Sequence, residues 1–368
     1  MWLKSSSILI SFVVIAISGG FCLGDCPSAD LTGDCFVDFE DFGVMAAQWL
    51  TTDPCIPEGM AYIPGGWFQM GDSFNEGEST ERPVHTVTVD SFYMGKYEIT
   101  NRQYCDYLDS AMSLGLITVT SGVVYKAGSG TSYPYCDTST SNSNSQIECY
   151  PRSYIFRVRI KGGRSMVNDP MVLVSWYGAA AYCNWRSQEE GRELCYNIST
   201  WDCDFSRNGY HLATEAEWEY AARGGLSGRR FPWGDTISHD QANYYSYWYG
   251  GHPYYSYDVS PTEGFDPTWN DGIEPYISPV GSFAANGYGL YDMVGNVWDW
   301  CNDWYSSSYY SSSPTNNPTG PTGPLSYRVL RGGSWYSHAH HCRASCRGYY
   351  SPDTRYDNVG FRLVLDFQ

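Results

Sequence analysis

Turn-forming residues are dense along this chain, and long runs of periodic hydrophobic residues are scarce. The sequence of 368 residues contains 38 glycines and 19 prolines. Glycine and proline interrupt helices and strands, so their density limits the length of any regular element. Helical signals become few after Arg223. The pattern predicts one mixed α+β domain over residues 56–368, rich in coil and held together by disulfides and ions rather than by long elements.

Capping patterns mark the helices that we expect. Thr100 with Gln103 and Thr214 with Glu217 form capping boxes, and Ser175 caps a third apolar segment. These patterns predict helices at residues 101–112, 176–185 and 215–223. Apolar and β-branched runs predict strands at residues 61–70 and 85–89. Two polar stretches read as loops, at residues 121–165 and 305–326.

The first 24 residues have the form of a cleavable secretion signal. Lys4 supplies the positive charge, a short apolar run spans residues 8–17, and Gly24 precedes the expected cleavage site. The run is shorter than the roughly 20 apolar residues that a membrane-spanning helix needs. We therefore expect a secreted protein, periplasmic or extracellular, with no membrane span. The alternative is an uncleaved anchor.

Charge and cysteine content agree with an exported protein. The chain has 40 acidic and 22 basic side chains and a formal net charge of −18, which argues against a nucleic-acid partner. An acidic surface suits solubility and calcium binding. The 13 cysteines are expected to be largely paired in an oxidising compartment. Cys195 with Cys203, and Cys136 with Cys149, are the pairs favoured by spacing.

Residues 25–55 form a separate acidic segment with one short amphipathic helix. Oxygen-bearing side chains occupy positions 1, 3, 5, 9 and 12 of a calcium loop, and the segment resembles one repeat of a dockerin-type module. Cys35 stands where such loops have a turn glycine, and a single loop is present. An acidic linker without an ion is the alternative. The expected calcium ligands are Asp30, Thr32, Asp34, Asp38 and Asp41.

Eight motifs then follow one another in a characteristic order. They are MAYIPGGWFQMG (60–71), SFYMGKYEITN (91–101), PMVLVSW (170–176), ATEAEWEYAARGG (213–225), FPWG (231–234), NGYGLYDMVGNVWDW (286–300), RGGSW (331–335) and NVGFR (358–362). Over about residues 59–364 the chain resembles the formylglycine-generating enzyme, or sulfatase-modifying factor, family. The resemblance implies a coil-rich variant of the C-type-lectin-like fold with bound calcium.

The resemblance also places two calcium sites in this domain. The first would use the Asn243 side chain and Tyr244 carbonyl together with Asp271 and the Ile273 carbonyl. The second would use the ligands Asp292 and Asp299 with the carbonyls of Met293, Gly295 and Val297. Two carboxylates seven residues apart around a Gly-Asn turn supply the hard oxygens that calcium prefers. Turn capping by Asp292 and Asp299 is the alternative.

The resemblance implies an oxidase that converts a protein cysteine to formylglycine, with copper(I) on two cysteines five residues apart. In this chain the second cysteine falls on Cys342, but the first falls on Ser337. Ser334 and His338 match family positions of the active centre. A hydroxyl cannot replace a thiolate on copper(I). The activity is therefore expected to be impaired or replaced.

Two further interpretations remain open. On an extended strand His338, His340 and Cys342 would share one face and could hold copper or zinc, or these residues are simply structural, with Cys342 or Cys346 in a disulfide. A catalytic member would act on an exported protein or peptide. A silent member would be a monomeric, lectin-like, calcium-dependent module that binds extracellular carbohydrate or peptide, which the 17% aromatic content suits.

Overall fold

The computed structural model describes residues 56–150, 153 and 155–367. Residues 57–368 form one compact unit, which is described below. The expected secretion signal and the expected calcium loop with Asp30, Thr32, Asp34, Asp38 and Asp41 lie outside the described residues. No helix in the described part of the chain combines the length and the apolar character that crossing a bilayer requires.

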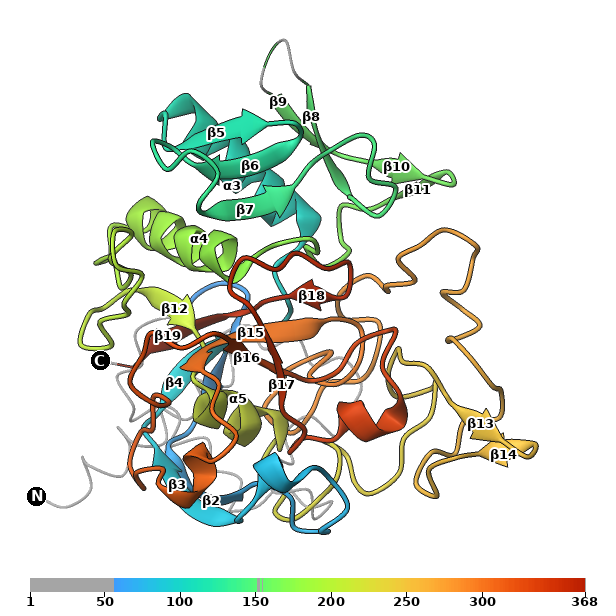
Figure 1. Cartoon of the computed structure of the whole chain (residues 1–368). Coiled ribbons are helices and arrows are strands. Elements are labelled where there is room, and N and C mark those ends of the chain that lie inside the picture. Colours follow the sequence, from blue (N-terminus) through green and yellow to red (C-terminus); the bar gives the residue numbers. More distant parts are fainter. Residues whose placement is uncertain (1–55, 151–152, 154, 368) are drawn as a thin grey trace, which may run out of the picture. The chain divides into compact units, whose positions relative to one another are not determined.

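An antiparallel sheet joins the two ends of the domain. Its strand order is β1-β4-β19-β12, so β19, the last strand of the chain, lies between β4 and β12 (Figure 1). The predicted strand over residues 61–70 is wrong as one element, because Pro64 and Gly65 divide it. Gly65 passes so close to the chain that a Cβ there would lie 2.8 Å from the Ser91 amide nitrogen. The sheet strands are β1 (Met60–Ile63), β4 (Phe92–Gly95), β12 (Tyr210–Leu212) and β19 (Leu363–Asp366).

A second four-stranded sheet carries the segments that matter for the site. Its order is β17-β16-β15-β18, with β18 parallel to β15 and the other pairs antiparallel. A short hairpin of β2 (Gly66–Met70) and β3 (His85–Val89) packs against α5, as does β16. The sheet strands are β15 (Trp298–Trp304), β16 (Arg328–Arg331), β17 (Gly348–Tyr350) and β18 (Val359–Gly360).

The three predicted helices are confirmed. They are α3 (Asn101–Ser113), α4 (Trp176–Glu189) and α5 (Glu215–Ala222). Thr100 and Thr214 accept from the backbone N–H groups of Gln103 and Glu217, and both glutamine and glutamate side chains return the bond. Ser175 caps α4 through the Gly178 N–H. Local capping chemistry was therefore sufficient to locate all three starts.

The expectation of a loop over residues 121–165 is wrong. The segment folds into short hairpins that sit above α3 in Figure 1. Each strand has only two to four residues between turn signals, so a pattern of alternation could not develop in the sequence. The segment 305–326 is coil, as expected, apart from the 3-10 turn η2 (Tyr309–Ser311). The strands are β5 (Ile117–Thr120), β6 (Val123–Lys126), β7 (Pro134–Asp137), β8 (Ile147–Tyr150), β9 (Ile155–Val158), β10 (Ile160–Lys161) and β11 (Arg164–Ser165).

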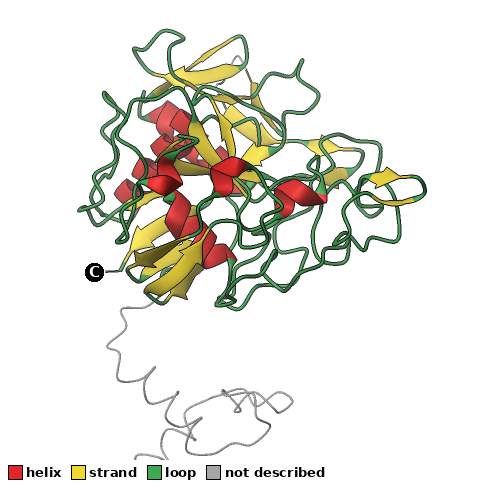
Figure 2. Cartoon of the chain, turned by 60° about the horizontal axis from the view of Figure 1, so that its bottom comes forward, coloured by secondary structure: helices red, strands yellow, loops and turns green. Residues whose placement is uncertain are grey.

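Coil dominates the region between α5 and β15, and loops make up much of the ribbon in Figure 2. The strands described in this region are β13 (Trp248–Tyr249) and β14 (His252–Pro253). Elsewhere in the domain, two more 3-10 turns are η1 (Ser79–Glu81), before β3, and η3 (Ala339–Cys342), after β16. Trp176, Trp218 and Trp300 are fully buried, so these tryptophans are core residues. The nine cysteines of the described residues are free thiols, and the expected pairs Cys195–Cys203 and Cys136–Cys149 are not formed.

Candidate functional site

The segment after β16 carries the predicted site residues Ser334 and Cys342, and Ser337 at the position of the missing cysteine. Gly332 and Gly333 have φ values of +97° and +78°, which glycine adopts without strain. A Cβ on Gly333 would lie 2.9 Å from the sulfur of Cys342, so this glycine also leaves the space that the cysteine occupies. The Ser334 hydroxyl lies 3.0 Å from the Ser337 hydroxyl. We call Ser334, Ser337 and Cys342 the thiol site.

The thiol site is buried and its polar atoms have partners. Ser334 and Ser337 are buried, and the Asn358 side chain donates to Ser334 Oγ at 3.3 Å. Cys342 packs in an apolar cluster with Phe231 and Tyr257. Burial raises the pKa of the Cys342 thiol well above its ordinary value, and the neighbouring Cys346 raises it further. Cys342 is therefore a neutral thiol at pH 7.

Cys346 is a second sulfur in the same neighbourhood. It is buried, and burial raises the pKa of its thiol to about 12. Arg331 holds the adjoining backbone by donating to the carbonyls of Cys346 at 2.6 Å and Ala344 at 2.8 Å. The same guanidinium pairs with the buried Glu219. The sequence gives no local sign of this clamp, because Glu219 lies 112 residues from Arg331.

The predicted alignment of His338, His340 and Cys342 on a strand is wrong. These residues belong to or flank the 3-10 turn η3, which spreads successive side chains in different directions. His338 stacks on Tyr247 with ring centroids 4.9 Å apart, and His340 stacks on Tyr255 at 5.7 Å. Burial lowers the pKa of both imidazoles. No group of three potential metal-ligand atoms forms here among the described residues.

The second predicted calcium site is a cluster of buried carboxylates. Asp292 Oδ2 accepts from the Gly281 N–H at 2.6 Å, and Asp299 Oδ2 accepts from Trp218 and from Arg362. The other oxygen of each carboxylate is buried without a hydrogen-bond partner. The backbone carbonyls of the expected ligands lie on the same loop. They belong to Met293, Gly295 and Val297.

Glu98 completes this cluster, although sequence reasoning missed it. Its carboxylate is fully buried, its Oε2 has no hydrogen-bond partner, and Arg362 lies 3.8 Å away. Burial raises the pKa of Glu98 well above its ordinary value, and Asp292 adds to the shift. The available sequence signal was an acidic residue between Tyr97 and Ile99, directly before a helix cap. We call Glu98, Asp292 and Asp299 the acidic cluster.

The acidic cluster carries more negative charge than its surroundings compensate. Three carboxylates face one guanidinium, that of Arg362, which also donates to the Tyr291 and Asp292 carbonyls. Burial raises the pKa of Asp292 to about 6. Unpaired buried oxygens are costly unless a proton or a cation occupies them. The donor set of hard oxygens fits a divalent cation such as calcium.

The residues of the first predicted calcium site lie in two pairs, each with hydrogen bonds of its own. The buried Asn243 donates to the Tyr276 carbonyl at 2.8 Å, and the Tyr244 carbonyl accepts from His239 at 3.2 Å. Asp271 is exposed and accepts from the Ile273 N–H. No hydrogen bond or ion pair links these two pairs within the described ranges. The Asn243 carbonyl instead accepts from the Asn296 N–H at 2.8 Å, which ties it to the acidic-cluster loop.

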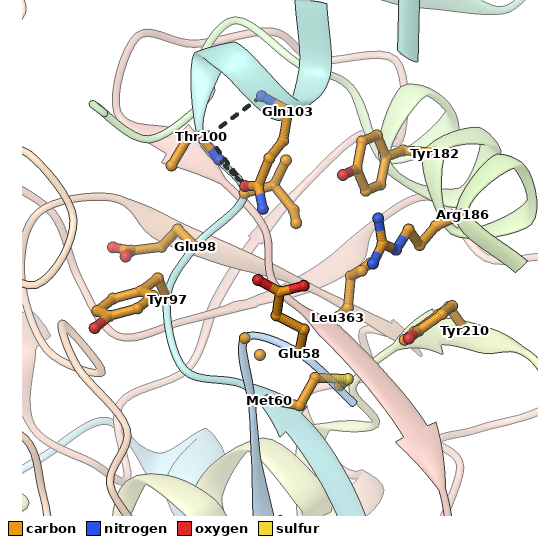
Figure 3. Close-up of a pocket in the computed structure, with 13 residues that line it drawn as sticks. Glu58, Met60, Tyr97, Glu98, Thr100, Gln103, Tyr182, Arg186, Tyr210 and Leu363 are labelled. Atoms are coloured by element: carbon orange, nitrogen blue, oxygen red, sulfur yellow. Dashed lines mark hydrogen bonds between the residues drawn. The ribbon is translucent and has the colours of Figure 1, made fainter. Parts of the chain in front are cut away.

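A separate hollow of about 110 Å³ has Glu98 among its lining residues (Figure 3). Glu58 and Arg186 extend into it from opposite sides, and the Glu98 carboxylate points away from it. The thiol-site residues do not line this hollow. It is therefore not the site that the family motifs indicate.

Comparison with known proteins agrees with this geometry. Residues 48–367 match the Sulfatase-modifying factor enzyme 1-like domain. The chain belongs to this family. It is 35% identical to the "Formylglycine-generating enzyme" of Streptomyces coelicolor, over 85% of this chain and 91% of that protein. It is also 30% identical to the "Inactive C-alpha-formylglycine-generating enzyme 2" of Bos taurus, over 87% of this chain and 92% of that protein.

Solved structures show the fold. The domain superposes on PvdO from Pseudomonas aeruginosa with a TM-score of 0.54 and 23% identity, covering 84% of this chain and 94% of that one. It superposes on Treponema denticola variable protein 1 with a TM-score of 0.55 and 24% identity, covering 84% and 95%. The coil-rich α+β architecture of the C-type-lectin-like class, expected from the motifs, is confirmed.

Proposed function

We propose that this protein is an exported member of the formylglycine-generating enzyme family whose cysteine-oxidase activity is lost or altered. The observation that carries the proposal is the hydrogen bond between Ser337 Oγ and Ser334 Oγ at 3.0 Å. Ser337 stands where the family resemblance requires the first copper-binding cysteine. Its hydroxyl is used within the protein, and the position offers no sulfur.

The residues present do not fit copper(I) held by two thiolates. Copper(I) prefers soft sulfur ligands, whereas a serine hydroxyl is hard and stays protonated. Cys342 is a buried, neutral thiol with an apolar surround. Cys346 is neutral too, since burial raises its pKa to about 12. We therefore assign no reaction step to copper in this chain.

Calcium is the ion that we expect in the domain. The unpaired oxygens of Asp292 and Asp299 would bind it together with carbonyls of the same loop, and Glu98 adds a third carboxylate to the cluster. The ion would supply the positive charge that Arg362 alone does not. A second ion would be held by Asn243, Tyr244, Asp271 and Ile273.

The decisive experiment compares wild type with Ser337→Cys. Both proteins are loaded with copper(I) and incubated with a Cys-x-Pro-x-Arg peptide, and mass spectrometry measures formylglycine. We expect no conversion by wild type, and tighter copper(I) binding with detectable conversion by the variant. Ser337→Ala is the matched control, since it also removes the hydroxyl but adds no sulfur. Conversion by wild type at the rate of Ser337→Cys would refute the proposal.

A second candidate function is a binding module for extracellular glycan or peptide. Three tyrosines form an exposed aromatic surface in the loops, with Tyr249 70%, Tyr254 58% and Tyr336 62% exposed. Exposed aromatic rings of this kind stack on sugars and peptide side chains.

The aromatic surface is testable by binding assays. Glycan arrays and peptide capture, each with and without a calcium chelator, would measure binding by wild type and by Tyr249→Ala with Tyr254→Ala. Trp67→Ala is the control, because Trp67 is 69% exposed but lies in β2. Binding that the tyrosine variant and the chelator abolish and the control retains would support this function. Equal binding by all three proteins would exclude this surface as the binding site.

A further inference from the structure

A histidine and two carboxylates meet away from the family site. His211 lies on β12, Glu217 on α5 and Asp366 at the end of β19. One ligand atom from each lies within 4.8 Å of the other two, and within the described residues this is the one group of three such side chains. None of the three belongs to the thiol site or the acidic cluster.

Hydrogen bonding fixes the tautomer of His211. Its Nδ1 lies 2.9 Å from the Leu212 carbonyl oxygen, and a carbonyl can only accept, so Nδ1 carries the proton. The side chain is fully buried, and its Nε2 makes no hydrogen bond. This nitrogen faces Asp366 Oδ1 at 3.4 Å. In the neutral ring, Nε2 would present a lone pair to two carboxylates, which is repulsive, so a proton or a metal ion belongs at this nitrogen.

The spacing between His211 and Asp366 is compatible with a shared metal ion. A charged N–H···O hydrogen bond measures about 2.7–2.9 Å. Two ligands of one tetrahedral ion, each bound at about 2.0–2.1 Å, lie roughly 3.3–3.4 Å apart. The observed 3.4 Å matches the second geometry. A proton would leave the group with a net negative charge, whereas a divalent ion neutralises both carboxylates.

The surroundings orient the ligands as metal sites do. Ligating histidines usually donate their second ring nitrogen to a backbone carbonyl or carboxylate, as His211 does. Glu217 is held through Oε2, which accepts from the Thr214 N–H at 2.8 Å in the capping box, so its other oxygen is available. The Phe205 ring covers the imidazole edge-on at 5.1 Å.

We propose that His211, Glu217 and Asp366 bind a zinc-type divalent metal ion, with one coordination position open to solvent. Imidazole nitrogen with carboxylate oxygen selects such an ion over calcium. Glu217 and Asp366 line a hollow of about 290 Å³, which Ser91, Asn317 and Thr319 also border. The open position faces this hollow, so water or a small polar ligand with an oxygen donor can complete the coordination.

Without a metal, the group is a buried ion pair. Burial lowers the pKa of His211, but the neighbouring carboxylates of Asp366 and Glu217 outweigh it and raise the pKa to about 9. A metal ion therefore has to displace the proton on His211 Nε2. A ring that stays doubly protonated is the alternative outcome of the test.

The experiment measures cobalt(II) and zinc binding by the purified full chain after calcium has been restored. Visible absorption of tetrahedral cobalt and elemental analysis give geometry and stoichiometry. We expect one equivalent in wild type and in Cys342→Ala, and at least tenfold weaker binding in His211→Gln and Asp366→Asn. His252→Gln is the matched control, since His252 also pairs Nδ1 with the next carbonyl, at 3.2 Å, but is exposed.

Two results would overturn this proposal. One is equal metal binding by wild type, Asp366→Asn and His252→Gln. The other is a doubly protonated His211 ring in wild type at saturating zinc, observed by nitrogen NMR. If His211→Gln fails to fold by circular dichroism, Asp366→Asn and the wild-type NMR measurement still decide. Copper(I) binding by Ser337→Cys is a separate readout, so failure here leaves the proposed function unaffected.

Discussion

The acidic cluster and the thiol site lie on adjacent loops, joined by the Gly295 N–H that donates to the Gly332 carbonyl at 2.9 Å. The acidic cluster holds three buried carboxylates, each with one oxygen that has no hydrogen-bond partner, and Arg362 is ion-paired with it. The thiol site consists of neutral groups that are buried and have hydrogen-bond or packing partners. One region therefore leaves carboxylate oxygens unpaired, while the hydroxyls of the other are paired. This difference leads us to expect that calcium affects stability at the acidic cluster and not at the thiol site.

The largest expected effect tests the dependence of the acidic cluster on its single guanidinium. Arg362→Met should lower the free energy of unfolding by about 3–5 kcal/mol, because it leaves buried carboxylates unpaired. Urea denaturation in excess calcium measures it. Arg102→Met is the control, since Arg102 is exposed and its pair with Asp106 should contribute less than about 0.5 kcal/mol. A loss below 1 kcal/mol for Arg362→Met would show that the stability of the acidic cluster does not depend on the charge of Arg362.

Removing calcium should have the next largest effect. A ligand at 100 times its dissociation constant stabilises the folded state by about 2.7 kcal/mol, so chelation should lower the free energy of unfolding by a similar amount. The melting temperature with chelator and after readdition of calcium measures the change. Asp292→Asn with Asp299→Asn should abolish the response, and Ser337→Ala should retain it. A response that is equal in all three proteins would place the ion elsewhere.

The pH dependence should have opposite signs with and without calcium. Burial raises the pKa of Asp292 from 3.8 to about 6, so the folded state binds more protons than the unfolded chain between these values. The stability of the calcium-free protein should therefore fall as pH rises from about 4 to 6. Calcium competes with those protons, so its stabilisation should grow over the same range. Denaturation midpoints measured against pH test this, and Asp292→Asn should flatten both trends.

The smallest effect concerns the hydroxyl pair of the thiol site. A neutral hydrogen bond contributes about 0.5–1.5 kcal/mol to stability. Ser334→Ala, Ser337→Ala and the double variant form a cycle whose coupling energy should fall in this range. It should not change with calcium, since neither hydroxyl belongs to the acidic cluster. A coupling energy near zero would mean that Ser337 is free to rotate toward another ligand.

The amino-acid sequence determined those features that depend on neighbouring residues. Thr100, Ser175 and Thr214 located the helix starts, because a cap and its first turn are adjacent in the chain. The ordered motifs identified the family, and Ser337, three residues after the Gly-Gly-Ser segment, revealed the missing sulfur. The short hairpins of residues 117–165 were not predictable, because strands of two to four residues are stabilised by pairing rather than by pattern.

The tertiary structure alone decided which distant charges meet. Glu98 joins Asp292 across 194 residues of sequence, and Asp366 meets His211 across 155 residues. The 3-10 turn at Ala339–Cys342 directed the histidines away from the sulfur, against the strand that their spacing favoured. Electrostatic energy depends on distance in space and on burial, and neither quantity is encoded by separation along the chain.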